Sequence, residues 1–248
     1  LPLFAALPIG MMLPWKRGDL RVAMRRLWLA AAAALGLAIV VGLLVDRRNT
    51  LALIGSALAL WLVVGAAVEL GERIGLGRLS LGQSLRRLVH LPRSALGMSI
   101  AHAALGILIA GITAVSTWQQ ERILVMKPGD QVQIAGYQVL LDEVGGFKGP
   151  NYDVQRGRMT VREGGKLFTI LRPERRFYRV QKRQTTEAAI HTSVLGDLYG
   201  VLGDEDGKGG YTVRLYYNPL APWIWVGAIF CALGGAISLT DRRHRIGA

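Results

Sequence analysis

The hydrophobic residues of this chain are gathered into blocks that match the thickness of a lipid bilayer. Half of the 248 residues (51%) are hydrophobic, and a helix of about 20 apolar residues crosses the roughly 30 Å of hydrocarbon in a membrane. The blocks lie at residues 1–14 (a partial span), 27–45, 51–70, 96–117 and 222–240. We therefore expect transmembrane helices over 1–117, a polar insert over 118–221, and a last span with a basic tail over 222–248.

The net charge of +13 is concentrated beside these blocks. Residues 119–221 hold 15 Lys/Arg and 12 Asp/Glu, whereas the other 145 residues hold 15 and 5. The positive-inside rule produces this distribution, which argues against a nucleic-acid partner and favours a lipid bilayer. With the basic segments around Arg17, Arg87 and Arg243 in the cytoplasm, we expect a multi-pass membrane protein whose C-terminus is cytoplasmic and whose insert lies on the outer side. In a Gram-negative bacterium this would be the inner membrane, with the insert in the periplasm.

A shorter segment at residues 74–91 has a different character. Leu81, Leu85 and Leu88 fall on one helical face, away from the neighbouring arginines. This pattern is typical of an amphipathic helix that lies in the membrane interface. Pro92 is expected to end that helix before the next span.

The insert changes from helical spacing to alternation. Residues 131–141 alternate on both sides of an Ala135-Gly136 break, which indicates a hairpin. Residues 158–162 and 166–171 also alternate, and residues 211–217 predict a further strand. Short strands at this spacing predict a small antiparallel barrel or sandwich. The expected fold class is an α-helical transmembrane bundle with an inserted all-β domain, which alone specifies no function.

His102 is an ionisable residue inside the apolar span 96–117. Such a residue is costly in hydrocarbon and normally faces a protein interior or a ligand, and neutral imidazole is a common ligand of haem iron. Its helical neighbours include the small residues Ala95, Ser99 and Gly106, and open space at Gly106 would let a flat macrocycle lie against this face. The same residues would also admit a neighbouring helix, with His102 hydrogen-bonded across the interface. The residues alone leave both interpretations open.

No second ligand is evident elsewhere in the chain. His90, His191 and His244 lie in polar segments, and we expect each to be solvated or hydrogen-bonded. The single cysteine, Cys231, lies in the last span, so the chain has no CxxCH motif and is not itself a c-type cytochrome. Any second axial ligand would have to come from outside this chain.

Arginines in the insert offer an anion-binding alternative. They are Arg172, Arg175 and Arg176. Arginine binds carboxylates such as haem propionates well, but a solvated strand face is the interpretation that we favour.

Six motifs occur in a fixed order along the chain. They are LGMSIAHAALG at 96–106, MKPGD at 126–130, TEAAI at 186–190, DLY at 197–199, VRLYYNP at 213–219 and WIWVG at 223–227. In this order they resemble the C-terminal part of the CcmF family, the haem lyase subunits of bacterial cytochrome c maturation. The resemblance covers essentially the whole chain.

The resemblance implies a defined role in cytochrome c-type biogenesis. Such a subunit receives haem from the haem chaperone CcmE and works with CcmH and CcmI, which handle apocytochrome c. It promotes thioether bonds between haem and the CxxCH cysteines of apocytochrome c. It also carries a haem b, held by two transmembrane histidines and acting in reduction. His102 matches the C-terminal histidine of that pair, so the resemblance implies that it is an axial ligand of haem b iron.

Other features of the family do not occur in this chain. The tryptophan-rich haem-handling segment, the external histidines beside it and the first transmembrane histidine would all lie upstream of Leu1. We therefore expect a fragment or a split-gene product that is inactive alone in holocytochrome c synthesis and needs the missing N-terminal part. An alternative is a non-catalytic membrane assembly subunit whose β domain docks partner proteins, with His102 serving only in helix packing.

Overall fold

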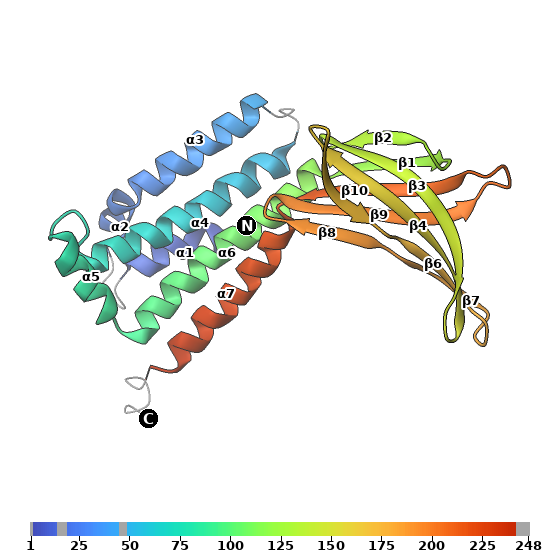
Figure 1. The fold of residues 1–248 in the computed structure, drawn as a ribbon. Helices are drawn as coiled ribbons and strands as arrows, with labels where there is room; N and C mark the ends of the chain where they lie inside the picture. Colours follow the sequence, from blue (N-terminus) through green and yellow to red (C-terminus); the bar gives the residue numbers. More distant parts are fainter. Residues whose placement is uncertain (1, 14–18, 45–48, 242–248) are drawn as a thin grey trace. The chain divides into compact units, whose positions relative to one another are not determined.

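The computed structural model describes residues 2–13, 19–44 and 49–241, and they divide into two units (Figure 1). A helical unit is formed by the chain up to Thr117 and from Trp223 onward, and an all-β unit extends from Trp118 to Pro222. The expected fold class, membrane helices with an inserted β domain, is confirmed. The basic residues Arg17 and Arg243, and His244, lie outside the described residues.

The helical unit follows the apolar blocks of the sequence. Its described helices are α1 (Pro2–Met12), α2 (Leu20–Arg26), α3 (Trp28–Leu44), α4 (Thr50–Ile74), α5 (Leu81–Val89), α6 (Arg93–Trp118) and α7 (Ala221–Leu239). Three of them, α4, α6 and α7, are long and apolar enough to cross a membrane. Helices α2 and α3 are bent by 58° where they meet and form a fourth candidate span if taken together. The protein is therefore a membrane protein.

Small residues bring these helices into close contact. A Cβ atom added at Gly106 of α6 would lie 2.8 Å from the carbonyl oxygen of Ala59 in α4. On another side of α6, a Cβ at Gly97 would collide with the backbone of Gly234 in α7. Contacts through small residues are typical of membrane helices, which gain stability from close packing rather than from the hydrophobic effect.

The expected helix over 74–91 is shorter in the structure. Helix α4 ends at a left-handed Gly75 (φ 73°), with hydrogen bonds from Gly75 N to Glu72 O and from Leu76 N to Gly71 O. This pair of bonds is a Schellman motif, which stops a helix. Helix α5 restarts only after Ser80, whose side chain forms a capping box with Gln83.

Helix α5 keeps the predicted amphipathic character. Leu81, Leu85 and Val89 are 73%, 61% and 81% exposed. They are four residues apart and therefore share one helical face. An apolar face of this kind that is not covered by protein suits the membrane interface.

The β unit consists of two antiparallel sheets. Its strands are β1 (Gln120–Met126), β2 (Gln131–Ile134), β3 (Tyr137–Lys148), β4 (Tyr152–Glu163), β5 (Lys166–Leu171), β6 (Glu174–Tyr178), β7 (Arg183–Glu187), β8 (Ala189–Ser193), β9 (Gly196–Glu205) and β10 (Tyr211–Pro219). One sheet has the order β1-β10-β9-β8, and the other has the order β2-β3-β4-β6-β7 with β5 paired to β4. Of the two architectures expected, the sandwich is the one formed.

A single core joins the two sheets. Val139, Leu141 and Met159 of one sheet pack with Leu202 and Val213 of the other, and all are fully buried. The alternation that predicted these strands places such residues on the inner face. The core gives the sandwich its own hydrophobic stabilisation, separate from that of the helices.

The predicted hairpins have the turns that their sequences require. Ala135 and Gly136 connect β2 to β3 with φ values of 50° and 85°, and Gly164 and Gly165 connect β4 to β5 with φ values of 55° and 80°. Two consecutive residues with positive φ form a type I′ turn, whose twist matches that of the strands. Glycine at three of these four positions, all but Ala135, removes the cost of a left-handed backbone.

Candidate functional site in the helical unit

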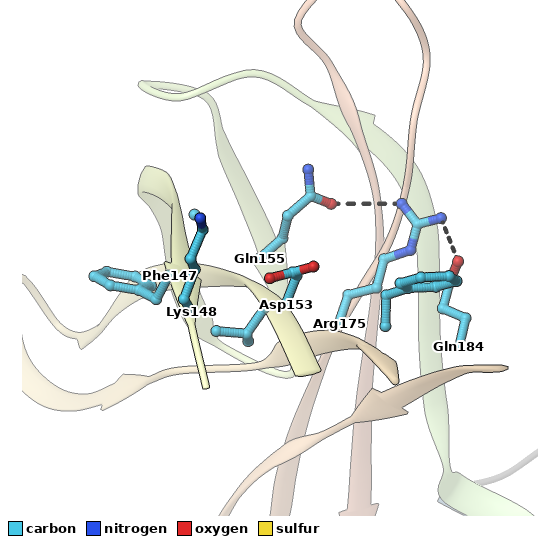
Figure 2. A pocket seen from close by; sticks show the side chains of 9 residues that line it. Phe147, Lys148, Asp153, Gln155, Arg175 and Gln184 are labelled. Carbon is cyan, nitrogen blue, oxygen red and sulfur yellow. Dashed lines mark hydrogen bonds between the residues drawn. The ribbon is translucent and has the colours of Figure 1, made fainter. Parts of the chain in front are cut away.

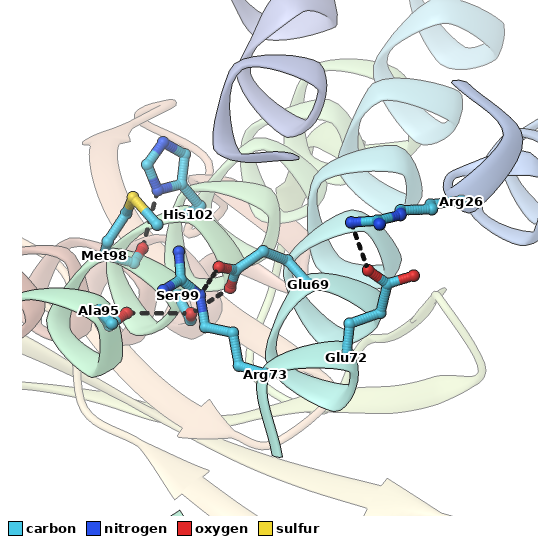
Figure 3. Close-up of polar contacts among 8 residues, drawn as sticks. All are labelled: Arg26, Glu69, Glu72, Arg73, Ala95, Met98, Ser99 and His102. Atoms are coloured by element: carbon cyan, nitrogen blue, oxygen red, sulfur yellow. Dashed lines mark hydrogen bonds and ion pairs between the residues drawn. The ribbon is translucent and has the colours of Figure 1, made fainter. Parts of the chain in front are cut away.

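His102 lies half-buried on α6, one helical turn after Met98. Its Nδ1 atom is 2.8 Å from the carbonyl oxygen of Met98 (Figure 3). Because a carbonyl oxygen only accepts hydrogen bonds, Nδ1 must carry the proton and donate it. In a neutral imidazole the other nitrogen, Nε2, then keeps a free lone pair. Nε2 makes no hydrogen bond to any residue that the structure describes, so it is chemically suited to bind a metal ion.

The small residues around His102 pack against α4. A Cβ at Gly106 would lie 2.7 Å from Val63 Cγ2, and one at Gly55 of α4 would meet the side chain of Thr113. The expectation of open space at Gly106 is therefore wrong, because α4 fills it. For this position, the second sequence interpretation, close approach of a neighbouring helix, is the one that holds. The role of His102 itself does not follow from these packing contacts.

A buried carboxylate lies on the same contact between α4 and α6 (Figure 3). The side chain of Glu69 is 3% exposed and accepts a hydrogen bond of 2.7 Å from Ser99 Oγ. It also pairs with Arg73, one turn further along α4. A buried charge is tolerated when it is paired and hydrogen-bonded. Figure 3 shows the imidazole of His102 pointing away from this cluster, so Ser99 and His102 lie on the same helix, α6, but face different directions.

Sequence reasoning missed Glu69. The available signal was an acidic residue within the apolar block 51–70, followed by Arg73 four residues later. That spacing places the two side chains together on a helix. Its second partner, Ser99, is 30 residues away in the sequence, and no local pattern predicts that contact.

The two other histidines within the described residues, His90 and His191, have contacts of their own. His90 Nδ1 lies 2.7 Å from the carbonyl oxygen of Arg86, and the His191 ring meets Phe168 edge-on at 4.8 Å. Among the described residues no group of three or more His, Cys, Asp or Glu side chains is arranged to hold a metal ion. Within this part of the chain, His102 therefore belongs to no ready-made cluster of metal ligands.

Two of the three arginines proposed for propionates are already paired inside the β unit. Arg175 donates to Gln184 Oε1 at 2.9 Å and to Asp204. It lines a hollow of about 580 Å³ on the β3–β4–β6–β7 sheet, which also exposes Phe147 and Phe177 (Figure 2). These contacts favour the interpretation of a structural strand face over that of an anion site.

Arg176 belongs to a second ion pair on this sheet. It pairs with Glu174 at 2.7 Å and lies 4.9 Å from the centre of the Tyr152 ring. Glu174 also pairs with Arg156. Burial raises the pKa of Glu174, but the hydrogen bonds from Arg176 and Arg156 outweigh it and hold that pKa below its ordinary value. Glu174 therefore remains ionised and holds β4 and β6 together.

Comparison with known proteins identifies the family. Residues 117–219 match the family model described as the CcmF C-terminal beta-sandwich. All 248 residues align at 42% identity with the cytochrome c-type biogenesis protein CycK of Rhizobium meliloti. The chain is also 33% identical, over 245 residues, to the cytochrome c-type biogenesis protein CcmF of Escherichia coli. The chain belongs to the CcmF family.

The chain corresponds to the C-terminal part of a CcmF protein. It spans 37% of the length of CycK and 36% of the length of Escherichia coli CcmF. A solved structure titled cytochrome c heme lyase CcmF has the same fold, with a TM-score of 0.71, 18% sequence identity, and coverage of 96% of this chain and 38% of that one. The CcmF fold thus includes both the helices that carry His102 and Glu69 and the β sandwich.

Proposed function

We propose that the chain acts in cytochrome c-type biogenesis as the C-terminal part of a haem lyase subunit. The names of its relatives and of the similar solved structure support this role. In this proposal the complete subunit takes haem from CcmE, works with CcmH and CcmI, and promotes thioether attachment of haem to apocytochrome c. The part described here supplies the β sandwich and one of the two haem ligands.

His102 is the residue that we propose as an axial ligand of haem b. The observation that carries the proposal is the hydrogen bond from Nδ1 to Met98 O, because it leaves the Nε2 lone pair for iron. Ligating histidines commonly donate their other N–H to a backbone carbonyl, which fixes the ring and its tautomer. The residues present therefore fit such a group. The bound haem would supply electron transfer, and His102 would orient the iron and tune its potential.

The proposed orientation places the β sandwich in the periplasm. Helix α6 begins at Arg93 and follows the basic helix α5, whereas its other end leads directly into β1. Basic residues are enriched on the cytoplasmic side of bacterial membrane proteins. His102 then lies nine residues, or about 13 Å, along α6 from its cytoplasmic end.

The test is the haem spectrum of the complete complex with His102→Ala. We expect the b-haem absorbance to be lost while the complex still assembles, because only the iron ligand is removed. His90→Ala is the matched control, since that exposed imidazole also bonds a carbonyl oxygen one turn earlier. An unchanged spectrum in the His102 variant, with the complex intact, would show that His102 is not the ligand.

A second candidate function is a scaffold that docks partner proteins through the β sandwich. The observation in its favour is the hollow bordered by Phe147 and Phe177, which are 54% and 45% exposed. The same purification separates the two functions. A complex that binds its partners but contains no haem supports the scaffold, whereas a stoichiometric bis-histidine haem spectrum supports the lyase subunit.

A further inference from the structure

The turn between β8 and β9 presents two apolar side chains at its tip. Ser193 pairs with Gly196 across the turn, so Val194 and Leu195 form a two-residue hairpin loop. Their exposed fractions are 71% and 66%. Neither Val194 nor Leu195 is among the residues with positive φ, and a turn without positive φ accepts most residue types. The backbone conformation of the turn therefore gives no reason for a Val-Leu pair at this position.

The turn is held beside the point where the chain enters its last span. The backbone N–H of Leu220 donates to the carbonyl oxygen of Leu195 at 2.9 Å. The hydroxyl of Tyr217 donates to the same oxygen at 3.3 Å. The residue after Leu220 is Ala221, the first residue of α7, which is long and apolar enough to cross a membrane. The turn is thus hydrogen-bonded directly to the residue that precedes this helix.

The composition around the turn also suits lipid. Residues 188–196 contain no Lys, Arg, Asp or Glu. The turn between β6 and β7 is a useful contrast, because it also exposes a valine, Val180 (83%), but flanks it with Arg179 and Lys182. From that turn the chain passes through β7 and β8 to the Val194–Leu195 turn, so the two turns lie at opposite ends of this run of strands (Figure 1). Of these two turns, only the one next to α7 is free of Lys, Arg, Asp and Glu.

We propose that Val194 and Leu195 insert into the lipid interface of the leaflet that α7 enters. The occupant of this apolar tip is the bilayer, because the tip is bonded to the residue that precedes a membrane span. The transfer of exposed apolar side chains from water to the headgroup–acyl boundary of the bilayer lowers the free energy. The insertion gives the sandwich an attachment to the membrane besides its two covalent connections. It depends on neither haem nor His102.

The experiment places a fluorophore at the tip in the complete complex. Cys231→Ala removes the only cysteine of this chain, and remaining cysteines elsewhere in the complex are replaced as well. Leu195→Cys is then labelled with an environment-sensitive dye, and the complex is reconstituted into nanodiscs with or without lipids spin-labelled near the headgroup. Val180→Cys, labelled in the same way, is the control for an exposed turn residue at the opposite end of this run of strands.

Insertion predicts quenching of the dye at position 195 by spin-labelled lipid and protection from aqueous iodide, with the opposite result at position 180. A dye at position 195 that iodide quenches and lipid does not would place the tip in water and overturn the proposal. A dye protected from both quenchers would show that another protein segment covers the tip, which overturns it equally. Both variants change exposed side chains, so the fold is expected to survive in each.

Discussion

The contact between α4 and α6 gives a prediction whose magnitude follows from the structure. In Gly106→Ala the new Cβ would lie 2.7 Å from Val63 Cγ2 and 2.8 Å from the carbonyl oxygen of Ala59. Ordinary contacts begin at 3.4 Å. The valine side chain is able to rotate, but the carbonyl belongs to the helix backbone. Helices α4 and α6 therefore have to separate locally by about 0.6 Å (3.4 minus 2.8), because packed interiors have no spare volume.

The expected loss of stability is the balance of two effects. Overpacking of this kind costs about 1–3 kcal/mol. Replacing glycine by alanine inside a helix returns up to about 1 kcal/mol, since alanine has the higher helix propensity. With the full return, we expect Gly106→Ala to destabilise the protein by about 0–2 kcal/mol, and by about 1–3 kcal/mol relative to a Gly→Ala change that causes no overpacking.

The assay is reversible unfolding of the complete protein in mixed micelles with increasing denaturing detergent, followed by helix circular dichroism. Gly36→Ala in α3 is the matched control, because a Cβ at Gly36 meets nothing within 4 Å. That variant should be unchanged or slightly stabilised. If Gly106→Ala is as stable as Gly36→Ala, the close contact between α4 and α6 is wrong.

Two further predictions concern paired carboxylates. Ser99→Ala removes the 2.7 Å hydrogen bond to Glu69 and leaves that buried carboxylate with Arg73 as its one partner among the described contacts. We expect the free energy of unfolding to fall by about 1.5–3 kcal/mol in the same assay. An unchanged free energy of unfolding would contradict the burial of Glu69. Glu174 has a lowered pKa in the folded protein, so its ion pairs stabilise the sandwich above its ordinary pKa of 4.5, and this stabilisation is lost as the pH falls through the lowered folded value. Thermal unfolding at about pH 7 and pH 3 should therefore differ less in Glu174→Gln than in the unchanged protein.

Local sequence patterns predicted most of the secondary structure. The length of the apolar blocks predicted the long helices, and pairs such as Ala135-Gly136 predicted hairpins, because both signals depend only on neighbouring residues. The amphipathic segment was predicted too long. The sequence around Gly75 does not show where a helix would stop. In the structure the positive φ of Gly75 ends α4 and separates α4 from α5. Glycine is compatible with both a weak helix and a left-handed stop, and the hydrogen bonds to Gly71 and Glu72 decide between them.

The candidate site was predicted less completely, since it depends on which helix covers which face. His102 was chosen as a candidate because an imidazole in an apolar span is conspicuous, and its role as a ligand stays a prediction. The surroundings of Gly106 were not predicted correctly, because a glycine leaves room equally for a macrocycle or for a neighbouring helix. Glu69 was missed for a related reason: its burial depends on Ser99, which a different helix supplies.

The contacts of α6 are compatible with a helix that packs on two sides and still presents the ligand that we propose. One side meets α4 through Ser99 and Gly106. Another side meets α7, where Cys231 Sγ lies 3.2 Å from the carbonyl oxygen of Ala101, the residue before His102. The described hydrogen bonds tie His102 to neither neighbour, only to Met98 of its own helix. Because α6 is held on two sides by other residues, the ring orientation of His102 is set by a rigid helix, and Nε2 stays available for a ligand bound outside both contacts.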